Sequence, residues 1–381
     1  MTKWPTKKLD EVAHVIMGQS PPSSTYNENG KGLPFFQGKA EFGETYPVPV
    51  KYCSVPIRIV ETSDVLVCVR APVGIVNIAK EKSCIGRGLA AVRTDNKILN
   101  QRFLYYFLKL NENNWSSLST GSTFVAIKRL HLENLKIPLP TLKIQHQIVE
   151  RLDAIKKAQV LNDKQIALAD ELFQSLLEKE LDSRGKGWEV KRLGEVTVFK
   201  RGPFGGSLKK EIFVEHGYKV YEQKNAIYND FVLGNYFISE EKYREMIDFA
   251  IHPGDLIVSC SGTIGKVAKV PADAQLGIIN QALLKITPLE DTITSDYLKF
   301  ILETLSIQRQ LTINSRGAAI QNVASVKETK RIKLHLPPLQ TQRQIVEKLQ
   351  AAHDYKKKLL EQKQKLKELF DSCLDKAMKG G

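Results

Sequence analysis

Hydrophobic positions along the chain follow two alternating patterns. Short apolar runs bounded by Gly, Pro and Asn predict β-strands, and they stand at residues 64–69, 89–92, 256–259 and 283–286. Two Gly-rich stretches, 18–43 and 202–217, are too polar and too often interrupted for regular structure. We predict that they form long surface loops, where recognition residues usually lie.

Each strand-rich region is followed by a heptad pattern of apolar residues. The patterns extend over about 35 to 40 residues, which is roughly 50 to 60 Å of helix at 1.5 Å per residue. A helix of that length cannot bury its apolar stripe against one small domain, so we predict that the two helices pack on each other as an antiparallel pair. The expected contacts join Ile148, Leu152, Ile155, Ile166 and Phe173 to Ile345, Leu349, Leu359, Leu366 and Phe370.

Four polar residues interrupt the middle of these heptad patterns, namely Gln159, Asn162, Lys356 and Lys363. One interpretation is that they are solvated or snorkelling side chains in a loose coiled coil. The other is that they fix the register of the two helices.

The chain repeats itself once. The tryptophan, leucine and valine of Trp4–Val12 keep their spacing in Trp188–Val196, and Leu139–Leu152 returns as Leu336–Leu349. We predict an α+β fold class, with two similar globular domains joined by two long antiparallel helices that form a coiled coil with internal pseudo-two-fold symmetry. The expected parts are a first domain (1–140), a central spacer helix (141–187), a second domain (188–338) and a C-terminal spacer helix (339–381).

Length and charge support two domains and a polyanionic partner. A chain of 381 residues exceeds one ordinary domain. No stretch approaches the roughly 18 apolar residues of a membrane span, and no apolar run follows the basic N-terminus, so we expect a soluble, cytoplasmic protein with no membrane partner. The net charge is +14, of which residues 1–140 supply +7 (18 basic, 11 acidic) and residues 188–338 supply +3 (20 basic, 17 acidic).

The five cysteines are expected to be reduced structural thiols, and no metal is expected. They are Cys53, Cys68, Cys84, Cys260 and Cys373. They lie far apart, and none stands in a C-x-x-C pair or near a histidine at zinc-ligand spacing.

Catalytic motifs are missing from the sequence. There is no tetrapeptide of Asn or Asp, two prolines and an aromatic residue, which marks amino-methyltransferases. Segment 261–267 resembles a phosphate loop, but Cys260 stands where glycine is needed and Val267 replaces the hydroxyl residue. Gly86-Arg87-Gly88 lacks the third glycine of a dinucleotide motif and is predicted to be a turn. The seven histidines form no motif with Ser, Cys or carboxylates, so we predict no catalytic residue.

The duplicated junctions resemble a known family. Ile137–Leu152 and Leu334–Leu349 each pass from Leu-Pro into Gln-x-Gln-Ile-Val-Glu, a basic residue and Leu. With the two opening tryptophan segments and Ser261–Val267, they resemble the specificity subunit of Type I restriction-modification systems over the whole chain. The resemblance implies two target recognition domains, each reading one half of a split DNA site. It also implies helices that set the spacing and dock two modification subunits.

The same resemblance implies that the chemistry lies in other subunits. It implies a complex that methylates adenine with S-adenosylmethionine and, with restriction subunits, cleaves DNA at the expense of ATP. S-adenosylmethionine, ATP and Mg²⁺ are then expected in the partner subunits and no cofactor in this chain. The chain would be a non-catalytic recognition subunit whose partners are double-stranded DNA, two modification (methyltransferase) subunits and the restriction (ATPase-nuclease) subunits.

Candidate DNA contacts are the polar side chains concentrated in irregular segments. Asn, Gln, Arg and Lys read base edges, while Lys, Arg and hydroxyl groups bind phosphates. The first half contributes Gln19, Ser20, Tyr26, Gln37, Lys39, Arg87, Thr120, Ser122, Thr123 and Lys128. The second half contributes Lys200, Lys209, Lys210, Gln223, Lys224, Asn225, Asn280, Gln281, Arg316, Gln321 and Asn322. We expect the clusters, more than each individual residue, to contact DNA.

Three alternatives stay open from the sequence alone. The chain could be an orphan specificity protein that binds DNA without an enzyme partner. It could be an architectural coiled-coil protein whose globular ends bind proteins, or an enzyme whose site has no recognisable motif. The duplicated junction helix favours assembly with an enzyme, because a simple DNA-binding protein does not need it.

Overall fold

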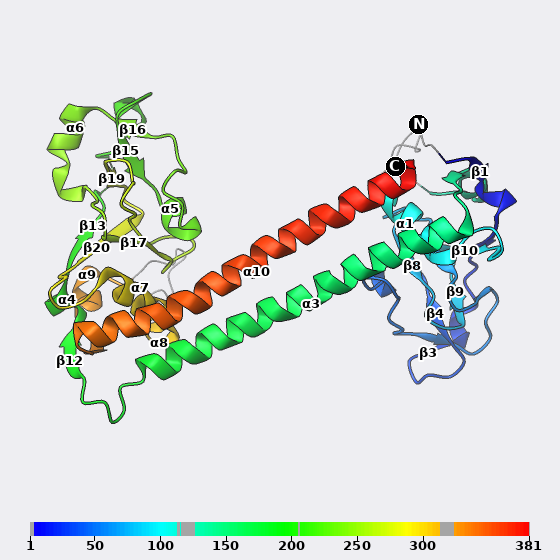
Figure 1. Ribbon diagram of the computed structural model, residues 1–381, viewed down its shortest axis with the longest axis horizontal. Coiled ribbons are helices and arrows are strands. Elements are labelled where there is room, and N and C mark those ends of the chain that lie inside the picture. The colour runs from blue at the N-terminus through cyan, green and yellow to red at the C-terminus, as the bar shows by residue number, and fades with distance from the viewer. Residues whose placement is uncertain (1–3, 113–114, 116–125, 205, 313–323, 381) are drawn as a thin grey trace. The chain divides into compact units, whose positions relative to one another are not determined.

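The computed structural model describes residues 4–112, 115, 126–204, 206–312 and 324–380 (Figure 1). The chain forms two compact units. Unit 1 consists of Met1–Lys164 and Leu360–Gly381, and unit 2 consists of Gln165–Leu359. Helix α3 (Leu142–Leu181) and helix α10 (Leu339–Lys379) each contribute residues to both units. Among the described helices, none is both long enough and apolar enough to cross a membrane.

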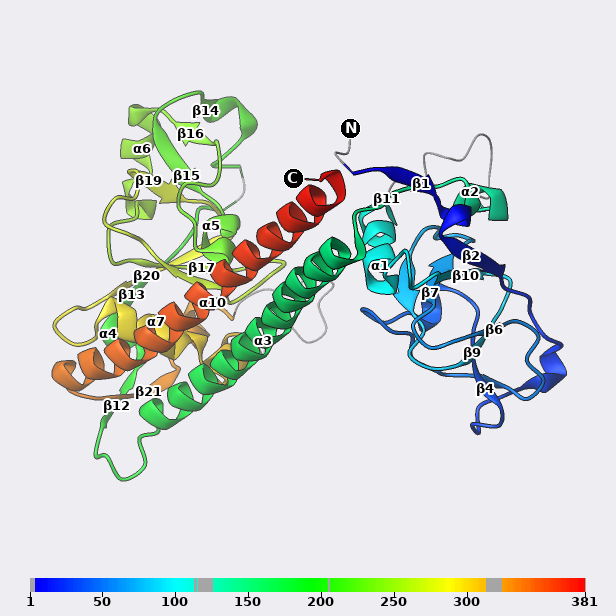
Figure 2. The ribbon, with the colours of Figure 1, turned by 45° about the vertical axis from the view of Figure 1, so that its right-hand side comes forward.

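Unit 1 contains a small α+β domain and its part of the helix pair. Its strands are β1 (Thr6–Lys8), β2 (Ala13–Met17), β3 (Tyr26–Asn27), β4 (Leu33–Phe36), β5 (Tyr52–Cys53), β6 (Ile59–Val60), β7 (Val65–Cys68), β8 (Val76–Ile78), β9 (Ser83–Ile85), β10 (Leu89–Thr94) and β11 (Lys136–Pro138). Its short helices are α1 (Gln101–Leu110) and α2 (Arg129–Glu133). Helix α1 lies between α3 and the strands β7 and β10 (Figure 2).

Unit 2 contains the second domain. Its strands are β12 (Glu189–Arg192), β13 (Thr197–Arg201), β14 (Phe213–Val214), β15 (Tyr218–Tyr221), β16 (Phe237–Ile238), β17 (Leu256–Ser259), β18 (Val267–Lys269), β19 (Gly277–Ile279), β20 (Leu283–Pro288) and β21 (Lys333–Leu336). Its helices besides the long pair are α4 (Leu193–Val196), α5 (Gln223–Tyr228), α6 (Glu240–Glu245), α7 (Ser295–Glu303), α8 (Leu305–Thr312) and α9 (Val326–Thr329).

The two domains share one topology. Unit 1 has the sheet β2-β10-β7-β8, and unit 2 has β13-β20-β17-β18 in the same order. A second sheet in each domain contains one parallel pair, β4 with β9 in unit 1 and β15 with β19 in unit 2. The strand after the opening tryptophan pairs with the strand before the long helix, as β1 with β11 and as β12 with β21. The repeat predicted from the sequence is therefore a repeat of the fold.

The predicted strands are confirmed, but both predicted Gly-rich loops are wrong in part. The apolar runs form β7, β10, β17 and β20. The Gly-rich stretch 202–217 contains the short strand β14. The Gly-rich stretch 18–43 was expected to be irregular, yet it contains β4, in which Phe35 and Phe36 are buried. Because the run Leu33–Phe36 is apolar, it forms a short buried strand beside β9 in spite of the polar residues around it.

The long helices pair in antiparallel fashion within each unit, as predicted. In unit 1, Gln159 Nε2 donates to the carbonyl oxygen of Leu366 at 3.2 Å. In unit 2, the ring centroids of Phe173 and His353 lie 6.2 Å apart, and Lys348 Nζ lies 3.0 Å from a Glu180 carboxylate oxygen. In unit 1, the residue number on α10 falls from Leu366 to Lys363 as the number on α3 rises from Gln159 to Asp163, and it falls in the same way in unit 2, which defines the antiparallel direction.

The ends of the heptad stripes also enter the domain cores, which the sequence reasoning had excluded. In unit 1, Leu152 and Phe370 belong to the same buried cluster as α1, and the rings of Phe370 and Tyr106 lie 6.0 Å apart. In unit 2, Phe173 lies 6.1 Å from Phe300 of α7. Among the predicted seam residues, Ile345, Leu349 and Leu359 are also buried, and Ile148, Ile155, Ile166 and Leu366 are half-buried. Helix α1 in unit 1 and helix α7 in unit 2 each present an apolar face to the long helices. The long helices therefore pack on a domain core near their ends and on each other elsewhere.

The polar residues that interrupt the heptad patterns make contacts between the helices. In unit 1, Lys363 Nζ lies 2.8 Å from a carboxylate oxygen of Asp163. In unit 2, Lys356 Nζ lies 2.5 Å from Asp170. These pairs are partly exposed, so each contributes little to stability. Their opposite charges nevertheless favour one alignment of the helices over a shifted one, which supports the register interpretation.

Asn162 is the exception, and it leads to a stability prediction. It is 1% exposed, and neither its Oδ1 nor its Nδ2 has a hydrogen-bond partner among the described residues. Replacing Asn162 with leucine should stabilise the helix pair of unit 1 by about 1 to 3 kcal/mol, because a buried amide without partners is costly. Hydrogen exchange of the unit 1 helix amides would measure the gain. Lys164→Leu adds the same side chain at an exposed position and should give none, whereas destabilisation by Asn162→Leu would contradict the prediction.

Candidate nucleic-acid interface

Four segments meet at one edge of each domain, and matching hydrogen bonds hold them there. In unit 1, Gly18 N donates to Leu89 O at 2.9 Å, and Gly86 N donates to Phe36 O at 2.8 Å. Val69 N donates to Gly88 O at 2.9 Å. These bonds join the segments after β2, after β4, after β7 and between β9 and β10. An irregular edge built from four segments can present many side chains to one ligand.

Unit 2 repeats the arrangement bond for bond. Gly202 N donates to Leu283 O at 3.0 Å, Asn280 N donates to Tyr221 O at 2.9 Å, and Cys260 N donates to Ala282 O at 2.9 Å. The repeated glycines have a steric reason. A Cβ atom at Gly18 would lie 2.1 Å from the carbonyl oxygen of Gly86, and one at Gly202 would lie 1.8 Å from that of Asn280. Only glycine allows the segments to approach this closely.

In unit 1, these segments enclose an open cavity of about 620 Å³. Five of the predicted DNA contacts line it, and they are Ser20, Tyr26, Gln37, Lys39 and Arg87. Gln19 is exposed next to Ser20, and Gln19 N donates to Ile85 O at 3.1 Å. These six described candidates of the first half therefore converge in space, although they come from separate segments.

The cavity is positively charged and rich in hydrogen-bonding groups. Lys39, Arg70 and Arg87 line it, and none of the described lining residues is acidic. Tyr26 donates its hydroxyl proton to Pro21 O at 2.7 Å. Burial raises the pKa of the Tyr26 phenol above its ordinary value, and the thiol groups of Cys53 and Cys84 add to this. Tyr26 therefore stays neutral, and the net charge of the lining comes from its three cations.

In unit 2, Gln223, Asn280 and Gln281 gather at the equivalent edge. Ser261 Oγ donates to Gln223 Oε1 at 3.2 Å, which joins the segment after β17 to the start of α5. Gln281 is exposed and Asn280 is half-buried. Lys209 and Lys210 are exposed in the segment that leads to β14.

Asn225, Lys224 and Lys200 of unit 2 were also predicted to contact DNA, but each has a partner within the domain, and the prediction for Asn225 is wrong. Asn225 is fully buried, and its Nδ2 donates to Asp230 O and Leu233 O, both at 2.8 Å. It therefore supports the loop after α5 and is not available to a base. Lys224 is paired with Glu222 at 2.6 Å, and Lys200 is paired with Asp248 at 2.7 Å. A DNA contact by either lysine would compete with its carboxylate.

Lys128 is exposed close to the cavity of unit 1. Ile127 N donates to Val69 O at 2.9 Å, so the segment that carries Lys128 runs beside the end of β7. The remaining candidates, Thr120, Ser122, Thr123, Arg316, Gln321 and Asn322, lie outside the described residues.

The structure adds two residues that the sequence reasoning missed. Arg70 lines the unit 1 cavity, but it follows the apolar run that ends at Val69 and so gave no signal as part of a polar cluster. Phe204 is 84% exposed in unit 2. It stands two residues after Gly202, as Ser20 stands two residues after Gly18, and so occupies the equivalent place. An exposed aromatic ring there could stack on a base or wedge between bases.

The described residues give no indication of metal or thiol chemistry. No group of three or more potential metal ligands occurs among them. Burial raises the pKa of Cys68 to about 12 and that of Cys260 to about 11, so both stay protonated at neutral pH. The segment 261–267 turns from β17 directly into strand β18, whereas a phosphate loop leads into a helix. The turn predicted at Gly86–Gly88 is confirmed, because Leu89 N donates to Gly86 O at 3.0 Å.

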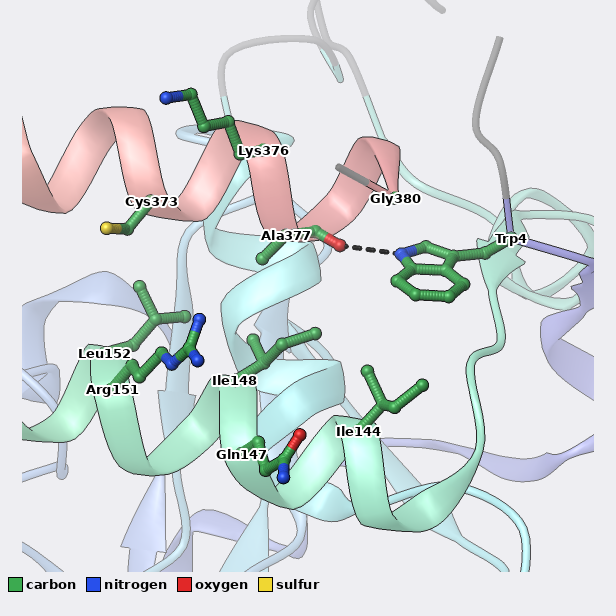
Figure 3. Close-up of a pocket in the computed structure, with 10 residues that line it drawn as sticks. All are labelled: Trp4, Ile144, Gln147, Ile148, Arg151, Leu152, Cys373, Lys376, Ala377 and Gly380. Carbon is green, nitrogen blue, oxygen red and sulfur yellow. Dashed lines mark hydrogen bonds between the residues drawn. The ribbon is translucent and has the colours of Figure 1, made fainter.

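A second cavity of unit 1 lies against the long helices and has a different character. It encloses about 340 Å³ between Trp4 and the facing sides of α3 and α10 (Figure 3). Its apolar lining includes Ile144, Ile148 and Leu152. Trp4 Nε1 donates to Ala377 O at 2.9 Å, which ties the first tryptophan segment to the last turn of α10. This surface is mostly apolar, although Arg151 and Lys376 also line it, and it shares no described lining residue with the basic cavity.

Together, these features define a class of protein: two copies of an α+β recognition domain, each attached to the same pair of long helices. The family of the type I restriction modification DNA specificity domain matches residues 1–169 and 185–369, and the chain belongs to this family. The two matched ranges correspond to the two copies of the domain.

Individual relatives agree with this family. A protein of Methanocaldococcus jannaschii, provisionally named the type I restriction enzyme MjaX specificity subunit, is 50% identical over 141 residues, which cover 37% of this chain and 33% of that protein. The MjaIX specificity subunit of the same organism is 28% identical over 56% of this chain and 55% of its own length. The matches thus span about a third and about half of these relatives. The crystal structure of a type I S subunit from M. genitalium shares the fold, with a TM-score of 0.60 and 18% identity over 99% of this chain and 96% of that one.

Proposed function

We propose that this chain is the DNA-specificity subunit of a type I restriction-modification complex. Each domain reads one half of a bipartite DNA site, while the helices set the spacing and dock two modification subunits. The observation that carries the proposal is the repeated edge, where equivalent backbone bonds gather polar and basic side chains in a chain of this family. Lysine and arginine at such an edge suit phosphates, and amides suit base edges.

The chain itself is proposed to be non-catalytic. S-adenosylmethionine, ATP and Mg²⁺ would bind to the modification and restriction subunits, and no cofactor would bind here. Equilibrium dialysis of the purified chain with labelled S-adenosylmethionine or ATP should detect no stoichiometric binding. Binding of either ligand at one molecule per chain would contradict the assignment and would favour an enzyme with an unrecognised site.

The phosphate-binding part of the proposal predicts a salt dependence. For the complex with its modification partner, each phosphate neutralised by Lys or Arg adds about 0.9 to the slope of log affinity against log salt. Lys39→Gln and Arg70→Gln should therefore each lower the slope by about 0.9. Lys97→Gln is the matched control, because Lys97 is exposed in the same domain but follows the opposite end of β10. Equal slopes for all three variants would exclude the basic cavity as the DNA-binding surface.

Copurification separates the proposal from its alternatives. A specificity subunit should form a stable complex with the modification subunit, and that complex should methylate a bipartite site. An orphan DNA-binding protein would bind the site alone, and an architectural protein would bind no DNA. The apolar cavity beside Trp4 is a candidate contact surface for the modification subunit, because it lies on the helices.

A further inference from the structure

The turn between β9 and β10 has a counterpart residue for residue in the second domain. Leu89 N donates to Gly86 O at 3.0 Å in unit 1, and Leu283 N donates to Asn280 O at 3.2 Å in unit 2. Flanking bonds from Val69 and Cys260 fix the residue before each leucine in the same way. These matched bonds make Arg87 and Gln281 structurally equivalent.

Both side chains are available to a ligand. Arg87 and Gln281 are exposed at the tips of their turns. The Arg87 backbone N–H donates to Ser20 Oγ at 3.3 Å, which holds the turn in place. The Arg87 guanidinium and the Gln281 amide have no hydrogen bond or ion pair with another described residue. Arg87 also lines the basic cavity of unit 1.

The difference between the two residues indicates what they contact. A phosphate oxygen can accept from arginine or from glutamine, but the phosphate backbone is the same at every sequence, so phosphate contact alone gives no reason for the residue to differ between the domains. Unit 2 has a neutral amide where unit 1 has a cation. A residue that reads a base does have a reason to differ, because the two half-sites can present different bases at that position. Arginine presents two donors that match O6 and N7 of guanine, and glutamine presents a donor and an acceptor that match N7 and N6 of adenine.

We propose that Arg87 and Gln281 are equivalent specificity-determining residues, each reading one base in its own half-site. Arg87 reads a guanine and Gln281 reads an adenine, both in the major groove. This inference rests on the proposed function, because it presumes that each domain reads a half-site. It goes further because it names, for each half-site, one side chain and the base that this side chain reads.

Exchanging the two side chains tests the inference. The complex of wild-type, R87Q or Q281R chain with its modification subunit is used to methylate a library of DNA sites, and the methylated positions are sequenced. R87Q should change one position of the first half-site from guanine to adenine and leave the second half-site unchanged. Q281R should change one adenine of the second half-site to guanine. The preference at each position should shift on the order of 10- to 100-fold.

A charge-matched control separates base reading from simple charge loss. K39Q removes the same charge from the same cavity, and it should weaken binding to all sites alike without changing the site. If R87Q behaves as K39Q does, Arg87 binds a phosphate and the inference is wrong. An unchanged site with unchanged affinity would also overturn it. Q281R provides an independent test in the other unit, so a folding defect of R87Q, detected by thermal melting, does not prevent a decision.

Failure of the proposed function would look different. In that case, the wild-type complex would methylate no bipartite site, and both proposals would fall together. If the wild-type complex recognises a bipartite site and the exchanged variants keep it, only the assignment of Arg87 and Gln281 fails.

Discussion

Replacing Gln145 with leucine is expected to destabilise unit 1 by about 3 to 5 kcal/mol. Gln145 is fully buried in the first turns of α3. Its Oε1 accepts a hydrogen bond from Asn100 N at 2.7 Å, and its Nε2 donates to Ile98 O at 3.0 Å and to Pro140 O at 2.8 Å. Leucine would leave three backbone groups without this partner, and a buried group without a partner costs about 1 to 3 kcal/mol. The hydrogen bonds of Asn100 N and Ile98 O are only partly buried, so the expected cost per group lies in the lower part of that range.

Gln342 holds the same place in unit 2, and Gln342→Leu should cost as much there. Its Oε1 accepts from Thr294 N at 2.9 Å, and its Nε2 donates to Thr292 O at 2.9 Å and to Pro337 O at 3.0 Å. In both units, one glutamine fastens the start of the long helix to the loop before α1 or α7 and to the Leu-Pro stop. This clamp gives a physical reason for the first glutamine of the repeated Gln-x-Gln motif.

The sequence supplies matched controls two residues further along. Gln147 and Gln344 belong to the same motif but are exposed, so Gln147→Leu and Gln344→Leu should change stability by less than about 0.5 kcal/mol. Hydrogen exchange in the full chain reads the units separately, through the amides of β10 and of β20. Gln145→Leu should speed exchange in β10 and leave β20 unchanged. Equal effects of the buried and exposed substitutions would contradict the clamp.

The same motif shows what the sequence could and could not predict. The sequence shows the junction twice, with Gln145 in one copy and Gln342 in the other, and this correctly predicted two copies of one structure. The sequence could not tell the buried glutamine from the exposed one in each motif, because both have the same residue type and the distinction depends on distant backbone groups. The predicted strands and long helices were correct because their apolar periodicity is local.

The sequence identified the polar segments of the candidate interface, but it could not predict that these segments meet on one surface. Polar segments around Gln37 and Arg87 were identified, yet their meeting depends on the parallel pairing of β4 with β9, which has no local signal. Arg70 was missed because it follows an apolar run. Asn225 was wrongly included because an amide in a polar segment has the same composition whether it supports the loop or faces solvent.

Removing one heptad from both long helices is expected to shorten the non-specific spacer of the DNA site and to leave both half-sites unchanged. Suitable segments are 157–163 of α3 and 363–369 of α10, because Asp163 contacts Lys363 and Gln159 contacts Leu366 within them. Removing both keeps the apolar stripe in phase and the remaining pairs in register. Seven residues at 1.5 Å correspond to about 10 Å, or about three base pairs at roughly 3.4 Å each.

The test is to map methylated positions for the shortened chain in complex with its modification subunit. Deleting 157–163 alone is the control. It shifts α3 against α10 by one heptad and separates the surviving contacts between these helices in unit 1. This variant should unfold the helix pair and lose methylation. The paired deletion should keep methylation, because each domain retains its own loops and its own glutamine clamp. If the half-sites changed while the spacer stayed the same, the helices would not set the spacing. The separation of the half-sites would then have to be set by the modification subunits.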